Sequence, residues 1–311
     1  MAADPTHIAY ELILKCAPEQ SHELQTFWNT YDVRFEIGPD RTGILMNANK
    51  TRVQYAHKDL QIIWLMSFSI WKSIEAFAPA VTIPSLTGVS TASILKFDKS
   101  LDEIERNYAE RIKAVECIMA MSTLDFAFWP PDIPKAVENR DVLESIEEKA
   151  VFDLAAMAIG IVFLHELRHV KFHRDHCKGS PRPVDLAEEE LLCDVWARDW
   201  FMSKLAHYAS THGHDYGQVC SKRAMALLIV CEFLRLADTH AGGFGSSDYP
   251  PLVDRIAALS AAMPLGEEDN FWIVSACVLL AELRRQGQKS VEIPQVSPKL
   301  VTEFLIKTLS P

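Results

Sequence analysis

The chain has 311 residues, of which 49% are hydrophobic and 23% charged, and its formal net charge is −11 at pH 7. This length and apolar content can bury one large core or two small ones, and the charged fraction is ordinary for a soluble globular protein. The acidic balance, without any dense run of Lys or Arg, argues against a nucleic-acid partner, because phosphate binding needs a basic patch.

The N-terminal sequence M-A-A-D-P-T-H has neither the basic nor the apolar segment of a secretory signal. The most apolar windows, 60–80 and 224–236, are interrupted by charged residues or are too short to span a bilayer. Seven cysteines, an odd number without a C-x-x-C pair, are typical of reduced and buried thiols. We therefore expect a cytoplasmic protein without a membrane span.

In the N-terminal region the pattern of apolar residues changes from helical to strand-like near residue 32. Residues 5–30 have helical periodicity, with a break at Pro18. Residues 32–57 alternate or cluster strand-forming residues between the turn sequences G-P-D-R-T-G and N-A-N-K, which predicts a small antiparallel sheet. An exposed edge of this sheet could bind a substrate as an added strand, but a sheet that only covers a helix is the simpler interpretation.

Three further segments precede a proline-rich stretch. Residues 60–77 predict an apolar helix, 80–98 a loop rich in Pro, Ser, Thr and Gly, and 101–121 an amphipathic helix. The sequence F-W-P-P-D-I-P at 128–134 forbids regular structure, because proline lacks the N–H that helices and sheets require. We place a boundary there, between an N-terminal α+β region, 1–135, and a helical core, 136–311, and expect one integrated unit.

Residues 151–164 are apolar on nearly every side of a helix, which predicts a helix buried in the core. This helix continues into H-E-L-R-H at 165–169. Residues four apart share one face of a helix, so His165 and His169 can bind one metal ion while Glu166 projects beside them and stays available as a base. This H-E-x-x-H pattern is typical of zinc peptidases.

A second helix carries the candidate third ligand. Asp185 and Glu188 form a variant of a capping box, which predicts a helix that begins near Leu186. A catalytic zinc ion takes three protein ligands and keeps one position for water, and His-His-Glu is a recurrent set. We therefore predict Glu190 as the third ligand of one Zn²⁺, and Asp194, one turn later, as hydrogen-bond acceptor for a ligand histidine.

Other candidate ligands fit less well. A second class of zinc peptidases extends the signature to H-E-x-x-H-x-x-G-x-x-H, but here Phe172 occupies the glycine position and Asp175 the ligand position. Cys193 could compete for the metal, although we expect the helix to turn it about 100° away from the face of Glu190. His212 and His214 lie in a predicted loop, where two histidines alone bind metal weakly.

The remaining segments complete a mainly helical α+β fold, in which the H-E-x-x-H helix forms the centre of a peptidase core. The helix of Glu190 should run to about Tyr208, followed by a loop at 211–217 and an apolar helix at 223–237. A glycine-rich loop is expected at 238–255, and further helices at 270–285 and 298–309.

The expected reaction is hydrolysis of a peptide bond, with Glu166 as the general base. The tetrahedral intermediate also needs a hydrogen-bond donor for its oxyanion. His240 and Tyr249 are the candidates here, and each can equally be read as a loop residue. The alternative function is a non-catalytic, zinc-stabilised binding protein, which we disfavour because structural zinc sites are usually closed by four ligands.

The sequence H-E-L-R-H-V-K-F-H, followed about twenty residues later by E-E-E-L-L-C-D-V-W-A, resembles the Lit-type phage-exclusion peptidases of the U49 family, which are gluzincin-like. Similarity extends to A-P-E at 17–19, the helix of Trp64 and P-P-L-V-x-R at 250–255. The resemblance implies an intracellular zinc endopeptidase that cleaves a host translation factor, elongation factor Tu, when it senses a phage protein. It thus implies a protein substrate, an activating phage peptide or protein, and a role in aborting infection.

Overall fold

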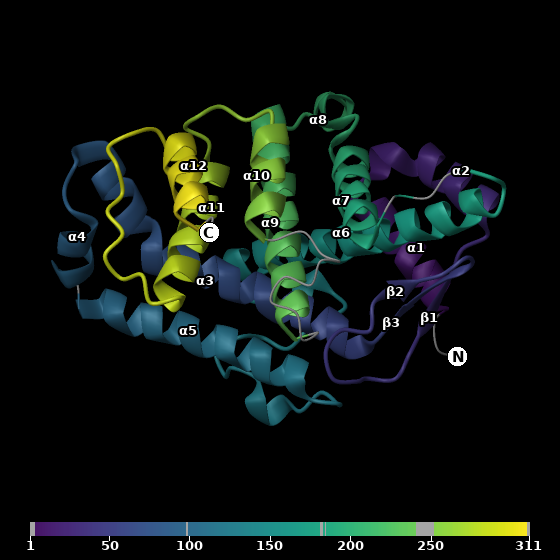
Figure 1. The fold of residues 1–311 in the computed structure, drawn as a ribbon, viewed down its shortest axis with the longest axis horizontal. Coiled ribbons are helices and arrows are strands. Elements are labelled where there is room, and N and C mark those ends of the chain that lie inside the picture. Colours follow the sequence, from purple (N-terminus) through teal and green to yellow (C-terminus); the bar gives the residue numbers. More distant parts are fainter. Residues whose placement is uncertain (1–3, 98, 181–182, 184, 241–251, 310–311) are drawn as a thin grey trace.

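The computed structural model describes residues 4–97, 99–180, 183, 185–240 and 252–309. The chain begins with α1 (Pro5–Cys16), η1 (Pro18–Gln20), α2 (Ser21–Tyr31), β1 (Arg34–Ile37), β2 (Asn47–Ala48) and β3 (Arg52–Tyr55), followed by α3 (His57–Thr87), α4 (Thr91–Phe97) and α5 (Lys99–Ala120). Two short turns, η2 (Phe126–Phe128) and η3 (Arg140–Val142), lead to α6 (Ile146–His176) and α7 (Leu186–Met202). The chain continues through α8 (Leu205–His212), α9 (Tyr216–His240), α10 (Leu252–Ala262), α11 (Asn270–Arg285) and α12 (Pro298–Leu309), which confirms a mainly helical α+β fold (Figure 1).

The sheet is mixed, so the prediction of an antiparallel sheet is wrong for one of its two strand pairs. Its strand order is β1-β3-β2; β2 pairs with β3 antiparallel, but β1 pairs with β3 parallel. The turn between β2 and β3 behaves as expected, because the Asn49 side chain accepts hydrogen bonds from the backbone N–H groups of Thr51 and Arg52. The returning strand β3 then enters between β2 and β1, an arrangement that local turn signals do not specify.

Helix α3 continues through the segment predicted to be a loop at 80–98. Pro79 and Pro84 lie inside the helix, where each removes one backbone hydrogen bond. Burial of the neighbouring apolar side chains, such as Phe77 and Val81, offsets this loss. The helix ends at Thr87 and is capped by Gly88, whose φ of +70° suits glycine, and α4 follows almost directly.

Helix α6 is the centre of the core. It begins with a reciprocal cap, in which the Ser145 hydroxyl accepts from the Glu148 N–H and the Glu148 carboxylate accepts from the Ser145 N–H. Helices α1, α3, α7 and α9 pack around it (Figure 1). Among the described residues it is the one helix long and apolar enough to cross a membrane, but 72% of its most apolar window is buried inside the protein. Its apolar surface is therefore covered by neighbouring helices.

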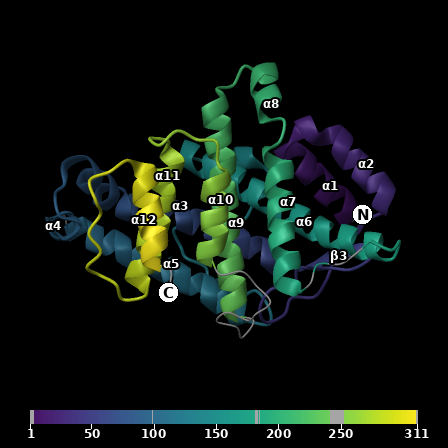
Figure 2. The same cartoon turned by 45° about the horizontal axis from the view of Figure 1, so that its top comes forward.

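Helices α7 and α9 cross α6, and α10 packs on α9 (Figure 2). Helix α7 begins at Leu186 as expected, because the Asp185 carboxylate accepts from the Glu188 N–H. It ends at Met202, before the predicted end near Tyr208, where Lys204 has a φ of +57° and α8 begins. Helix α9 extends to His240, into the predicted glycine-rich loop, whose residues 241–251 lie outside the described part of the chain.

The buried side chains form one hydrophobic cluster that draws on both sides of the boundary placed at residue 135. Trp64 of α3 contacts Phe152 of α6, and the Trp64 indole donates to the Pro134 carbonyl, 2.8 Å away. This packing fits one integrated unit, and the division at 135 itself stays a prediction.

Candidate metal centre

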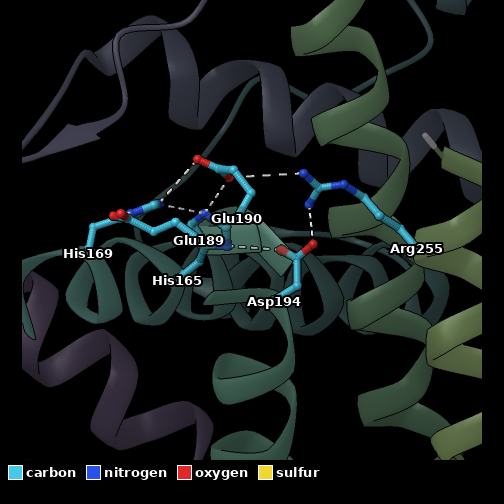
Figure 3. Close-up of polar contacts among 6 residues, drawn as sticks. All are labelled: His165, His169, Glu189, Glu190, Asp194 and Arg255. Atoms are coloured by element: carbon cyan, nitrogen blue, oxygen red, sulfur yellow. Dashed lines mark hydrogen bonds and ion pairs between the residues drawn. The ribbon is translucent and has the colours of Figure 1, made fainter. Parts of the chain in front are cut away.

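Three predicted ligands meet where α6 and α7 cross (Figure 3). The Nε2 atom of His165 lies 3.1 Å from one Glu190 oxygen, and the Nε2 atom of His169 lies 3.3 Å from the other. The two Nε2 atoms are 3.2 Å apart. All three side chains are mostly buried; those of His169 and Glu190 keep 14% and 15% exposure, so the cluster can be reached from solvent.

Each ligand histidine is held through its other ring nitrogen. The Nδ1 atom of His165 lies 2.9 Å from Asp194, as the sequence predicted, and that of His169 lies 2.8 Å from Glu189. A carboxylate can only accept a hydrogen bond, so both Nδ1 atoms carry the proton, and in a neutral imidazole the lone pair then lies on Nε2. Both Nε2 atoms face the Glu190 carboxylate.

With both imidazoles neutral, as metal binding requires, this arrangement needs a cation between the three groups. Two neutral imidazoles and a carboxylate would turn three acceptors toward one another, and two imidazolium rings would bring two N–H donors to within 3.2 Å. In a tetrahedral zinc site with bonds of about 2.0 to 2.1 Å, neighbouring ligand atoms lie about 3.3 to 3.4 Å apart. The observed separations of 3.1 to 3.3 Å therefore fit a zinc ion held by His165, His169 and Glu190.

The electrostatics also favour a positive charge at this point. Burial opposes protonation of His165, but its hydrogen bonds to Asp194 and Glu190 outweigh burial and raise its pKa to about 10. Burial likewise opposes protonation of His169. Its hydrogen bonds to Cys193, Glu189 and Glu190 outweigh burial and raise its pKa above the ordinary range. Burial would raise the pKa of Glu190, yet the two imidazoles hold it well below its usual value. The carboxylates thus create a negative potential that a divalent cation would satisfy.

Glu166 is buried beside these residues, with 8% of its surface exposed. Burial raises the pKa of its carboxyl group, and the nearby His169 and His165 rings oppose that shift. A carboxylate whose pKa is raised toward neutrality is better suited to accept and return a proton. This property fits the predicted role of Glu166 as general base.

Cys193 lies closer to the histidines than expected. Its sulfur and one ring nitrogen from each of His165 and His169 all lie within 4.8 Å of one another, so these three residues form another set that could hold a metal ion. The expected separation from the face of Glu190 was wrong, because three residues turn a helix by about 300°, which leaves only about 60° between the two side chains. Burial raises the pKa of the thiol, and a neutral thiol is a weaker ligand than the ionised Glu190.

Sequence reasoning missed two residues that support the ligands. Glu189 has Cys193 and no acidic residue four positions later, so helical spacing does not mark it, yet it holds His169. Arg255 of α10 was noted only as part of a resemblance, but its Nη1 donates to Asp194 and its Nη2 lies 4.0 Å from Glu190 (Figure 3). In each case the partner belongs to a different helix, so helical spacing within one segment could not reveal it.

Asp175, His212 and His214 lie outside this cluster. Asp175 pairs with Lys171 at the end of α6, and His212 and His214 stack near Tyr208. Two predicted oxyanion donors cannot be placed: Tyr249 lies outside the described residues, and so does the side chain of His240. Their role stays a prediction.

The model of one protein family, Peptidase U49, matches residues 53–275, which are 223 of the 311 positions. The chain belongs to the peptidase U49 family. Searches of curated proteins and of solved structures found no match. The matched region contains all of α6, α7 and α10, so the U49 assignment covers the two histidines, Glu190 and Arg255. Membership in this family makes the chain a peptidase.

Proposed function

We propose that this U49 peptidase is a zinc-dependent endopeptidase, in which His165, His169 and Glu190 hold one zinc ion. The observation that carries this proposal is the convergence of two imidazole Nε2 atoms and a carboxylate at separations of 3.1 to 3.3 Å. Asp194 and Glu189 keep both rings in the tautomer that presents Nε2. A bound zinc ion would supply Lewis acidity, which lowers the pKa of a water molecule and polarises a peptide carbonyl.

The protein's own contribution to the reaction is proton transfer and orientation. Glu166 accepts the proton of the attacking water and then delivers it to the nitrogen of the leaving amine. Its buried position supports this role, because burial raises the pKa of its carboxyl group and so makes its ionised form a better base. Asp194 and Glu189 do not react; they fix the rings through their Nδ1 atoms.

The test of this proposal is Glu166→Gln, with Glu147→Gln as the matched control, since Glu147 is an exposed residue of the same helix. We expect Glu166→Gln to keep one zinc ion per chain by metal analysis and to lose cleavage, because an amide cannot accept the water proton. The control should keep both properties. Cleavage at the wild-type rate by the Glu166→Gln variant would remove Glu166 from the mechanism.

We further propose that the substrate is a host protein, elongation factor Tu, that a phage peptide or protein activates the reaction, and that cleavage takes place in the cytoplasm and aborts infection. Family membership and the resemblance of the zinc-site sequence to the Lit-type peptidases support this proposal. The protein should be mixed with host lysate, with and without phage proteins, and new termini sought by mass spectrometry. Termini that appear only with phage protein and intact Glu166 are expected; cleavage of other proteins alone would refute this substrate.

A second candidate function rests on Cys193. If its thiol joined His165, His169 and Glu190, the site would have four ligands and would be a structural zinc clamp in a binding protein. Cobalt substitution separates the two functions, because a thiolate ligand gives cobalt an intense near-ultraviolet charge-transfer band that imidazole and carboxylate do not. The zinc peptidase predicts a spectrum that Cys193→Ala leaves unchanged; a band lost in this variant would favour the clamp.

A further inference from the structure

A hollow of about 720 Å³ lies on a different side of α6 from the metal centre. It is bounded by α1, α6, α9 and the segment before α6. Asp153, which lines it, precedes His165 by twelve residues on the same helix, so it lies about 18 Å away along the axis and is turned about 120° around it. A ligand in this hollow would therefore not reach the metal centre.

The hollow combines an apolar lining with a cationic rim. Apolar side chains come from three helices, and exposed cations stand around them. The apolar residues are Leu12, Phe152, Met157 and Val219, and the exposed cations are Lys15, Arg140 and Lys222. Two acids, Glu138 and Asp153, also line the hollow. The excess of exposed cations contrasts with a chain whose net charge is −11.

The carboxylate of Asp153 forms ion pairs with two of these cations. Asp153 lies 2.9 Å from Arg140 Nε and 2.9 Å from Lys222 Nζ. A guanidinium has five donors and an ammonium three, so both groups keep donors that a ligand carboxylate can use. Lys15, at the end of α1, has no acidic partner among the residues that the structure describes. The rim can therefore accept further negative charge.

A second hollow, of about 540 Å³, continues on the other side of the Asp153 bridge and shares Arg140, Gln218 and Lys222 with the first. Trp71 and Ile146 line it, and Ile146 is 86% exposed. Its remaining acids are engaged at helix N-termini: Asp215 accepts from the Gln218 N–H and Asp269 from the Phe271 N–H. The two hollows thus form one trough, in which the exposed cations line the larger hollow and Asp215 and Asp269 lie with the apolar residues in the smaller one.

We infer that this trough, lined by the residues named above, binds an acidic peptide segment of a partner protein that also carries apolar side chains. Glutamate or aspartate side chains of the segment would pair with Lys15, Arg140 and Lys222, and its apolar side chains would cover Ile146 and Trp71. The inference rests on the proposed function only in treating the partner as a protein that a peptidase recognises. Binding here would hold the partner while a separate segment reaches Glu166.

The probe for this site is a fluorescein-labelled peptide of alternating Glu and Leu, and binding to the full chain is followed by anisotropy. We expect saturable binding, no binding of a matched Lys/Leu peptide, and weakening of about fivefold by either Lys15→Glu or Lys222→Glu. The matched control is Lys50→Glu, an exposed lysine in the turn between β2 and β3, which should leave the Kd unchanged. Equal affinities for all three variants would overturn the inference.

Further control measurements make the result interpretable. Thermal melting shows whether the variants fold, and Lys15→Glu answers the question even if Lys222→Glu does not, because Lys15 makes no ion pair among the described residues. Sedimentation tests whether a second copy of the chain binds at the trough, and flotation with phosphatidylserine vesicles tests a lipid surface. Lys15-dependent binding to either one, in place of the peptide, would refute a peptide partner. Binding must persist in chelator and in Glu166→Gln, so failure here and failure of the zinc peptidase proposal are distinguishable.

Discussion

Arg255 and Asp194 form an ion pair that joins α10 to the candidate metal centre. One Asp194 oxygen accepts from Arg255, and the other lies 2.9 Å from His165 Nδ1. The Arg255 side chain is almost fully buried and also lies 4.0 Å from Glu190. A buried guanidinium therefore orients two carboxylates, one of which is a proposed zinc ligand and the other the partner of a proposed ligand.

The first prediction concerns this pair. Arg255→Met should lower zinc affinity by about tenfold to a hundredfold, because Asp194 loses the donor that fixes its orientation and the His165 ring is then held less firmly. Zinc affinity is measured by competition with a coloured chelator. The matched control is Arg284→Met, which breaks an arginine pair with Glu105 outside the metal centre. If both substitutions change zinc affinity equally, Arg255 acts on general stability and not on the site.

The second prediction separates the neighbouring glutamates 189 and 190. Glu190→Ala should lose the metal, because it removes a proposed zinc ligand. Glu189→Ala should retain zinc with affinity lowered by about tenfold to a hundredfold, since it removes the acceptor of His169 Nδ1 and leaves the three proposed ligands in place. Metal analysis after dialysis and a chelator titration give both values. Full occupancy in Glu190→Ala, with loss in Glu189→Ala, would exchange the two roles.

The third prediction concerns Asp59, which is buried at the start of α3. Burial raises its pKa from 3.8 to about 6, although it accepts hydrogen bonds from the N–H groups of Ala56 and Leu45 at 2.9 and 3.2 Å. The folded protein therefore binds this proton more tightly than the unfolded chain does. The favourable contribution is fully present below about pH 4 and is lost as pH rises through about 6.

Asp59→Asn removes this titration. Relative to wild type, the variant should gain about 3 kcal/mol of unfolding free energy between about pH 4 and about pH 7, since two pKa units correspond to that amount. The nearby charges of Lys58 and Asp40 stay in both proteins. Urea unfolding at the two pH values measures the difference, and Asp102→Asn, at an exposed acid, is the control. A pH-independent difference between wild type and Asp59→Asn would show that Asp59 has an ordinary pKa.

Helical spacing, together with the ligand sets that zinc prefers, was enough to predict part of the site. His165 and His169 share a face of α6, and Glu190 and Asp194 share a face of α7, so helical periodicity was sufficient. Glu189 and Arg255 could not be assigned in this way, because their roles depend on how α7 and α10 meet α6. Helix geometry also determines the position of Cys193, about 60° around α7 from Glu190, but the prediction placed it about 100° away.

The fold shows the same division between local and distant interactions. The starts of α6 and α7 follow from capping residues, Ser145 and Asp185, whose hydrogen bonds are made within three residues. Strands β1 and β3 pair in parallel although β2 lies between them in the sequence, and no turn sequence specifies this pairing. The length of α3 was underestimated, since Pro79 and Pro84 signal a break that burial of the surrounding helix overrides.

The last prediction concerns Gly160, where α1 crosses α6 closely. A Cβ atom at this position would lie 3.3 Å from the Cys16 sulfur and 3.9 Å from the Ile13 Cα. Gly160→Ala should be nearly neutral, because the gain in helix propensity of about 1 kcal/mol offsets a small shift of Cys16. Gly160→Leu should cost about 1 to 3 kcal/mol, since the larger side chain must push the α1 backbone away.

Urea unfolding of both Gly160 variants measures these changes. Gly266→Leu is the control, because nothing lies within 4 Å of a Cβ built there. Helix α6 carries His165 and His169 beyond this crossing, so a displaced α6 should also weaken zinc binding in Gly160→Leu and leave it unchanged in Gly160→Ala. If Gly160→Leu unfolds at the same urea concentration as wild type, the crossing tolerates the larger side chain and α1 does not hold α6 in place.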